Sequence, residues 1–175
     1  AAITSKQMAA LTGDEVAGLT TAQVSNLSTA QLVALTTDQV TSIETADLAV
    51  LSSVQIAALK TSQVASLSID QLSSMSTDQV NAFTTAQIAA LTTDQVVGLT
   101  TAQVSSLLTK QIAALTTGQI AAMEVDDLAV VTTSQFAAIT SKQMAALTGD
   151  EVAGLTTDQV SNCLLYTSDA ADDTP

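Results

Sequence analysis

The chain has 175 residues, and only 2% of them are aromatic. Hydrophobic residues make up 47%, mainly as alanine, valine and leucine, so a conventional core built on large side chains is not expected. Seventeen acidic and four basic side chains give a net charge of -13. Four scattered lysines cannot neutralise a run of phosphates, which argues against a nucleic-acid partner. The apolar content is too high for an acidic disordered tail.

Two series of apolar residues run through the chain with a period of eight. We number octad positions by the remainder of the residue number on division by eight, with a remainder of zero counted as position 8. Position 3 holds the leucine series, from Ile3 to Leu155, and position 8 holds the valine series, from Met8 to Val160, both without exception. The unit is an octapeptide, L-[TS]-T-x-Q-[VI]-A-A, repeated twenty times over residues 3–162.

This period excludes both a single long helix and a strand. Eight residues of α-helix advance about 800°, so an apolar stripe would circle one helix within about five units. In a strand the two apolar series would point to opposite faces, because their spacings of five and three are odd. Each octad must therefore contain its own turn.

Each octad also carries the signature of a helix start. Thr20-x-x-Gln23 and Thr92-x-x-Gln95 read as capping boxes, in which the hydroxyl accepts from the N3 backbone and the glutamine side chain bonds the N-cap N–H. The two apolar series flank the box at the N′ and N4 positions of a hydrophobic staple. The spacing predicts a helix of about seven residues in every octad, beginning after its capping hydroxyl.

Such short helices cannot fold alone, so they must stack on neighbouring repeats of the same chain around a shared core. The sequence predicts an all-α fold, a tight α-solenoid with one very short helix per eight-residue repeat over residues 1–162. Several position-2 residues lie near a helix C-terminus, where a left-handed conformation is expected: Gly18, Asn26, Gly98, Gly154 and Asn162. Alanine at position 2 of most other octads leaves the geometry of those corners open.

Some octads depart from the pattern. Four residues replace the capping serine or threonine, namely Glu44, Lys60, Leu108 and Glu124, while Asp47 and Asp127 replace the glutamine. Glu124, Asp126 and Asp127 form an acidic group that could hold a hard cation. Acidic residues also stabilise a first helical turn, and the spacing matches no known calcium loop. We favour this second interpretation and assign no metal site.

No catalytic constellation is visible. The chain has no histidine, and no serine or threonine lies beside a base, so we expect neither an enzyme nor a cofactor site. No apolar run is long enough to cross a bilayer. Repeated Thr-Thr pairs, such as Thr92-Thr93, could recognise ice or glycans, but the first threonine of each pair is assigned to capping.

A second level of repetition joins residues 3–26 to residues 139–162, which differ only at Ala22 and Asp158. This near-identity predicts a recent duplication within a longer array. The octad pattern then stops at Cys163, in a tail that holds the only cysteine, tyrosine and proline of the chain. Cys163 to Asp172 resembles a translated sequencing adapter, which implies that residues 163–175 are a non-native, disordered tail of a metagenomic fragment.

The octads resemble the LTTxQVAAL arrays of very large bacterial proteins that are secreted or surface-associated and described as adhesin-like. The resemblance covers residues 1–162 and implies a structural spacer or stalk outside the cell. The alternative is a binding scaffold, for a protein or a glycan, that uses the variable octad position 6. That position holds, among others, Lys6, Asp14, Ala22, Asp38, Ser62, Asp70, Lys110 and Gly118.

Overall fold

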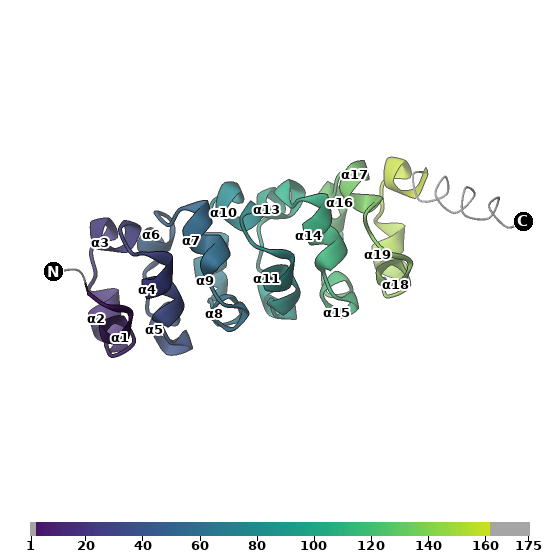
Figure 1. Ribbon diagram of the computed structural model, residues 1–175. Coiled ribbons are helices and arrows are strands. Elements are labelled where there is room, and N and C mark those ends of the chain that lie inside the picture. The colour runs from purple at the N-terminus through teal and green to yellow at the C-terminus, as the bar shows by residue number, and fades with distance from the viewer. Residues whose placement is uncertain (1–2, 162–175) are drawn as a thin grey trace, which may run out of the picture.

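The computed structural model describes residues 3–161, which form short α-helices joined by tight corners (Figure 1). Over this range no residue lies in a β-strand. The predicted all-α class, with one short helix per repeat, is confirmed. The helices are α1 (Ser5–Met8), α2 (Gly13–Ala17), α3 (Thr21–Ser25), α4 (Thr29–Ala34), α5 (Thr37–Thr41), α6 (Thr45–Leu48), α7 (Ser53–Ala58), α8 (Thr61–Ala65), α9 (Ile69–Ser73), α10 (Thr77–Asn81), α11 (Thr85–Ala90), α12 (Thr93–Val97), α13 (Thr101–Ser106), α14 (Thr109–Ala114), α15 (Thr117–Ile120), α16 (Val125–Val130), α17 (Thr133–Phe136), α18 (Ser141–Met144) and α19 (Gly149–Ala153), and residues 157–161 are again helical. The tail predicted for residues 163–175 lies outside the described residues.

The helices start where the capping boxes predict. Thr92 has extended backbone angles, and its hydroxyl accepts from the Gln95 backbone N–H at 3.1 Å. The Gln95 Oε1 in turn accepts from the Thr92 N–H at 2.8 Å. Where lysine or leucine stands at the cap, only this second bond remains, as between Gln111 and the Leu108 N–H at 2.9 Å. Glu44 and Glu124 make no side-chain cap bond.

The helices are shorter than predicted, with four to six residues rather than seven. Each ends in a tightened turn, as where the Leu91 N–H donates to the carbonyl of Ile88, three residues back, at 3.2 Å. Leu91 itself has φ -57° and ψ 144°, which turns the chain out of the helix. The leucine-series residue therefore belongs to the corner.

The left-handed corners predicted at octad position 2 are wrong. No residue from 3 to 161 has a positive φ. Gly18 and Gly154 have φ -80°, Gly98 has φ -78° and Asn26 has φ -93°, while Asn162 lies outside the described range. The corners close with right-handed backbone because the tightened turn already redirects the chain, so glycine at position 2 must have another cause.

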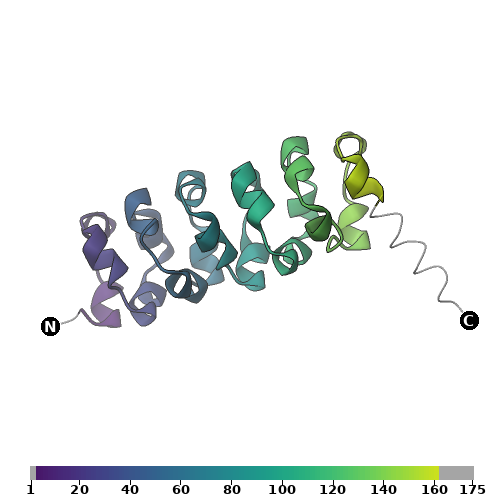
Figure 2. The same cartoon turned by 90° about the horizontal axis from the view of Figure 1, so that it is seen from above.

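Three octads make one turn of the solenoid. Helices that lie three apart in sequence pack on one another, which gives three stacks of helices along an elongated rod (Figures 1 and 2). Stack A contains α1, α4, α7, α10, α13, α16 and α19; stack B contains α2, α5, α8, α11, α14 and α17; and stack C contains α3, α6, α9, α12, α15 and α18. The chain thus advances by one turn every 24 residues.

The two apolar series form one continuous core. The valine series is buried from Met8 to Phe136, and the leucine series is buried from Leu35 to Val131. In the outermost described turns the burial is incomplete, and Ile3, Val152 and Val160 are exposed. These turns pack against a described turn on one side only, so each lacks half of the contacts that an interior turn makes.

Candidate functional site

The glutamine at octad position 7 does more than complete a capping box. The Gln95 Nε2 donates to the carbonyl of Leu67 at 2.7 Å and to that of Val64 at 3.1 Å, 28 and 31 residues earlier. Both carbonyls belong to the corner that lies one turn below. The same pair of bonds recurs at Gln39, Gln63, Gln71, Gln79, Gln87, Gln103, Gln111, Gln119, Gln135, Gln143 and Gln159.

We call this set of bonds the glutamine ladder. Each buried amide satisfies two kinds of backbone group that a short helix leaves unpaired. Its oxygen accepts from the first N–H of its own helix, and its nitrogen donates to the last carbonyls of a helix one turn below. The ladder therefore joins adjacent turns by polar bonds inside an apolar core, where an unpaired partner is costly.

Sequence reasoning predicted only the capping half of this ladder. A capping box accepts glutamate as readily as glutamine. The chain uses glutamine in sixteen of its twenty octads, and only an amide can also donate. That preference is the signal from which the second half could have been inferred.

Carboxylates interrupt the ladder at Glu15, Asp47, Asp127 and Glu151. An ionised carboxylate accepts but cannot donate, so it cannot bridge to the turn below. By the ladder spacing, the carbonyls left without a glutamine at Asp127 are those of Val96 and Leu99. Burial raises the pKa of the Asp127 carboxyl, and the charges of Glu124 and then Asp126 raise it further.

The acidic group weighed as a cation site does not converge. Glu124 and Asp126 are exposed, whereas Asp127 is buried against the turn below. Among residues 3–161, no group of three or more acidic, histidine or cysteine side chains is placed to hold a metal ion. The carboxylates of α16 thus act on the fold through the ladder and through their mutual repulsion.

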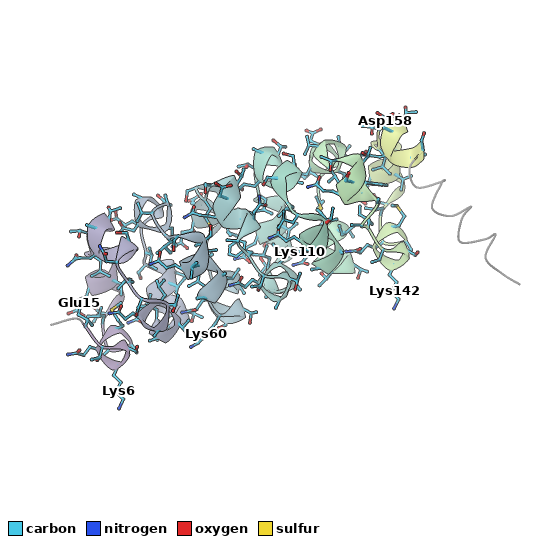
Figure 3. The ribbon with its side chains drawn as sticks, turned by 45° about the horizontal axis from the view of Figure 1, so that its top comes forward. Lys6, Glu15, Lys60, Lys110, Lys142 and Asp158 are labelled. Atoms are coloured by element: carbon cyan, nitrogen blue, oxygen red, sulfur yellow. The ribbon has the colours of Figure 1, made fainter. Side chains whose placement is uncertain are left out.

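Octad position 6 is exposed in every described octad, as predicted. It lies in the first turn of each helix, on the outside of the rod. The lysines at this position, Lys6, Lys110 and Lys142, extend away from the ribbon in Figure 3. The residues weighed as a recognition face are therefore accessible, and they are distributed over all three stacks.

Glycine at position 2 makes room for a large side chain at position 5. A Cβ added to Gly98 would lie 2.5 Å from the Cγ2 of Ile69, which belongs to the helix one turn below. The Val125 side chain occupies the corresponding space beside Gly154. Both pairs are 29 residues apart, and Ile69 and Val125 are the two large apolar residues at position 5. The glycines answer a close approach rather than a left-handed turn.

The helices of residues 3–161 are too short, and not apolar enough, for any of them to span a bilayer. The chain matches no curated protein and no solved structure. The pattern of the ALTTAQ repeat matches it five times, over residues 14–43, 40–77, 70–101, 94–125 and 120–157. These matches cover most of the chain, and they fall on the octads whose caps, core and ladder are described above. The chain therefore belongs to the ALTTAQ repeat family.

Proposed function

We propose that the chain is a structural spacer or stalk within a larger bacterial protein that acts outside the cell or at its surface. The observation that supports a spacer is the sameness of the turns. Each interior turn buries the same two series and makes the same contacts with the turn three helices away. The length of such a rod grows with the number of octads, without any change in its chemistry.

The glutamine ladder supports this proposal physically. A spacer must hold its length, and a solenoid whose turns touched only through methyl groups would slide more easily than one whose turns also share directional bonds. Each rung fixes the axial register of two turns through two buried donor–acceptor pairs, as Gln103 does with the carbonyls of Leu72 and Met75, both at 2.8 Å. The extracellular setting follows from the likeness to large secreted and surface-associated arrays.

We propose no enzymatic role. The sequence offers no histidine and no hydroxyl beside a base. The buried polar side chains that the structure describes are largely committed to capping and to the ladder. Asp127 is perturbed, but its buried position leaves no open site beside it for a substrate.

A binding scaffold is the second candidate, and one observation favours it. Octad position 6 is exposed throughout, yet it varies among lysine, aspartate, alanine, serine, valine and glycine, whereas the capping and core positions hardly vary. Variation confined to an exposed position is typical of solenoids that recognise partners.

Capture experiments separate the two functions. The chain is immobilised beside a variant in which every charged residue at position 6 is replaced by serine, and both are exposed to polysaccharide and host-surface extracts. A spacer should retain no saturable partner on either surface. A partner that binds the native chain saturably, and is lost on the variant, would overturn the spacer in favour of the scaffold.

A further inference from the structure

The two nearly identical segments of the chain start seventeen octads apart, at Ile3 and Ile139. A stack gains one helix every three octads, and seventeen is not a multiple of three. The counterpart of α1 in the second segment is α18. This helix belongs to stack C, whereas α1 belongs to stack A.

If the stacks ran straight along the rod, α18 would lie on the side of α3 and not on that of α1. Figure 1 shows instead that the stacks wind around the rod: stack C begins with α3 at the upper edge and ends with α18 at the lower edge. The helix α1 also lies at the lower edge. Residues 157–161, the counterpart of α3, lie at the upper edge as α3 does. A small rotation between successive turns thus accumulates until the second segment regains the orientation of the first.

The side chains follow the helices. Lys6 and Lys142, which are equivalent in the two segments, both extend from the lower edge of the rod in Figure 3. Asp158, from residues 157–161, extends from the opposite edge. All three side chains are exposed.

We propose that the seventeen-octad duplication is matched to the superhelix, so that each copy of the segment presents its side chains to the same side of the rod. A duplication of sixteen or eighteen octads would preserve every cap and core position, but it would turn the copy by about a third of a turn. The matched period makes a one-sided surface on which equivalent lysines recur. It fits a flat or extended partner with regularly spaced sites, because such a partner meets several copies only if they face it together.

The orientation can be tested without a natural ligand. In the full chain with Cys163→Ser, cysteines are introduced by Lys6→Cys and Lys142→Cys, and each is coupled through a short linker to one alkyl chain. Binding to neutral phosphatidylcholine vesicles is compared with that of the chain carrying Lys6→Cys alone. Because both anchors reach one flat bilayer together, the pair should bind about 10²-fold more tightly than the single anchor.

The matched control combines Lys6→Cys with Asp158→Cys, which places the second anchor on the opposite edge near the same end of the rod. It should bind within about twofold of the single anchor, because geometry forbids joint insertion. A second control duplicates Leu115–Ala122 in the Lys6/Lys142 pair. This insertion lies between the Ile69–Gly98 and Val125–Gly154 contacts, so it should keep the helical circular dichroism and abolish the tight binding.

Equal binding by the two anchor pairs, or no gain for the Lys6/Lys142 pair, would overturn the proposal. Tight binding that survived the one-octad insertion in a folded chain would do the same. The geometry is independent of whether the array acts as a spacer or a scaffold, so these results leave the capture experiment unaffected.

Discussion

The Ile69 side chain lies in the space that a side chain at residue 98 would need, so the absence of a Cβ at Gly98 allows two adjacent turns to approach. The relationship joins α9 to α12 within stack C. In most other octads the same two positions hold a threonine or serine below an alanine or serine, as at Thr93 and Ala122. A larger residue on one turn is thus matched by a smaller one on the next.

We expect Gly98→Ala to lower the free energy of unfolding by about 1–3 kcal/mol, because it overpacks this contact. Ile69→Thr in the same chain should recover most of the loss, since it recreates the Thr–Ala combination found elsewhere. Thermal and urea unfolding of the two single variants and the double variant measure the coupling. Gly118→Ala is the matched control: nothing lies within 4 Å of an added Cβ, so it should stabilise by about 0.5–1 kcal/mol through helix propensity. Additive effects of Gly98→Ala and Ile69→Thr would contradict the packing account.

The ladder predicts that a glutamate cannot replace a ladder glutamine. Gln95→Glu keeps an acceptor for the Thr92 N–H but loses both donors to the turn below, in a side chain that is only 4% exposed. Two buried carbonyls would then face a carboxylate, at a cost of about 1–3 kcal/mol. Chemical unfolding measures the difference.

Gln23→Glu tests whether the loss comes from the ladder. Gln23 accepts from the Thr20 N–H at 2.8 Å in the same way, but it is exposed and has no described turn below it. Its replacement should change the stability by less than about 0.5 kcal/mol. Equal effects at Gln23 and Gln95 would show that the ladder bonds contribute nothing.

The features that the sequence could predict are the local ones. The start of α12 is encoded within four residues, from Thr92 to Gln95, and the burial of Val96 follows from a period that needs no knowledge of the fold. The number of octads per turn is different, because it depends on which carbonyls lie beside Gln95 in space. The role of Gly98 is equally non-local. Its partner Ile69 lies 29 residues away in sequence, so nothing within the octad distinguishes a glycine that makes room from one that forms a left-handed turn.

Asp127 predicts a dependence of stability on pH. Because its pKa in the folded chain is raised above the ordinary value of 3.8, the folded state favours the protonated form. Its contribution to stability is therefore fully present below pH 3.8 and is lost as the pH rises through the folded pKa. Asp127→Asn should lose less stability than the native chain between acidic and neutral pH. Asp127→Gln should in addition restore the rung to Val96 and Leu99, and so raise the melting temperature at neutral pH.

The exposed Asp94, at position 6 of its octad, provides a control for this titration. Asp94→Asn removes one negative charge from the same rod without touching the ladder. Its pH profile should therefore run parallel to that of the native chain. If Asp94→Asn flattened the profile as much as Asp127→Asn does, net charge rather than the buried carboxyl would be responsible.

The capping hydroxyls predict a difference between neighbouring threonines. Thr92 accepts from the Gln95 backbone N–H, whereas Thr93 is the first residue of α12 and its side chain is exposed. Thr92→Ala should cost about 0.5–2 kcal/mol. Thr93→Ala should stay within about 0.5 kcal/mol of the native chain. Urea unfolding distinguishes the two, and a larger loss at Thr93 would place the helix start at the wrong residue.

The last prediction concerns register. Deleting the whole octad Leu115–Ala122 leaves every later residue at its own octad position, so helices three apart can stack again. Gln135 would then reach the carbonyls of Val96 and Leu99, which the native chain leaves opposite Asp127. Deleting only Leu115–Gly118 moves every later valine-series residue to the exposed capping position, so the turns beyond the deletion lose their core.

Far-UV circular dichroism and thermal unfolding compare the two deletions with the native chain. We expect the octad deletion to keep the helical signal per residue and a single cooperative transition, because contacts in a solenoid are local and each turn is equivalent to the next. The half-octad deletion should lose helical signal and melt at a lower temperature. Equal melting temperatures would mean that the octad is not the structural unit of this chain.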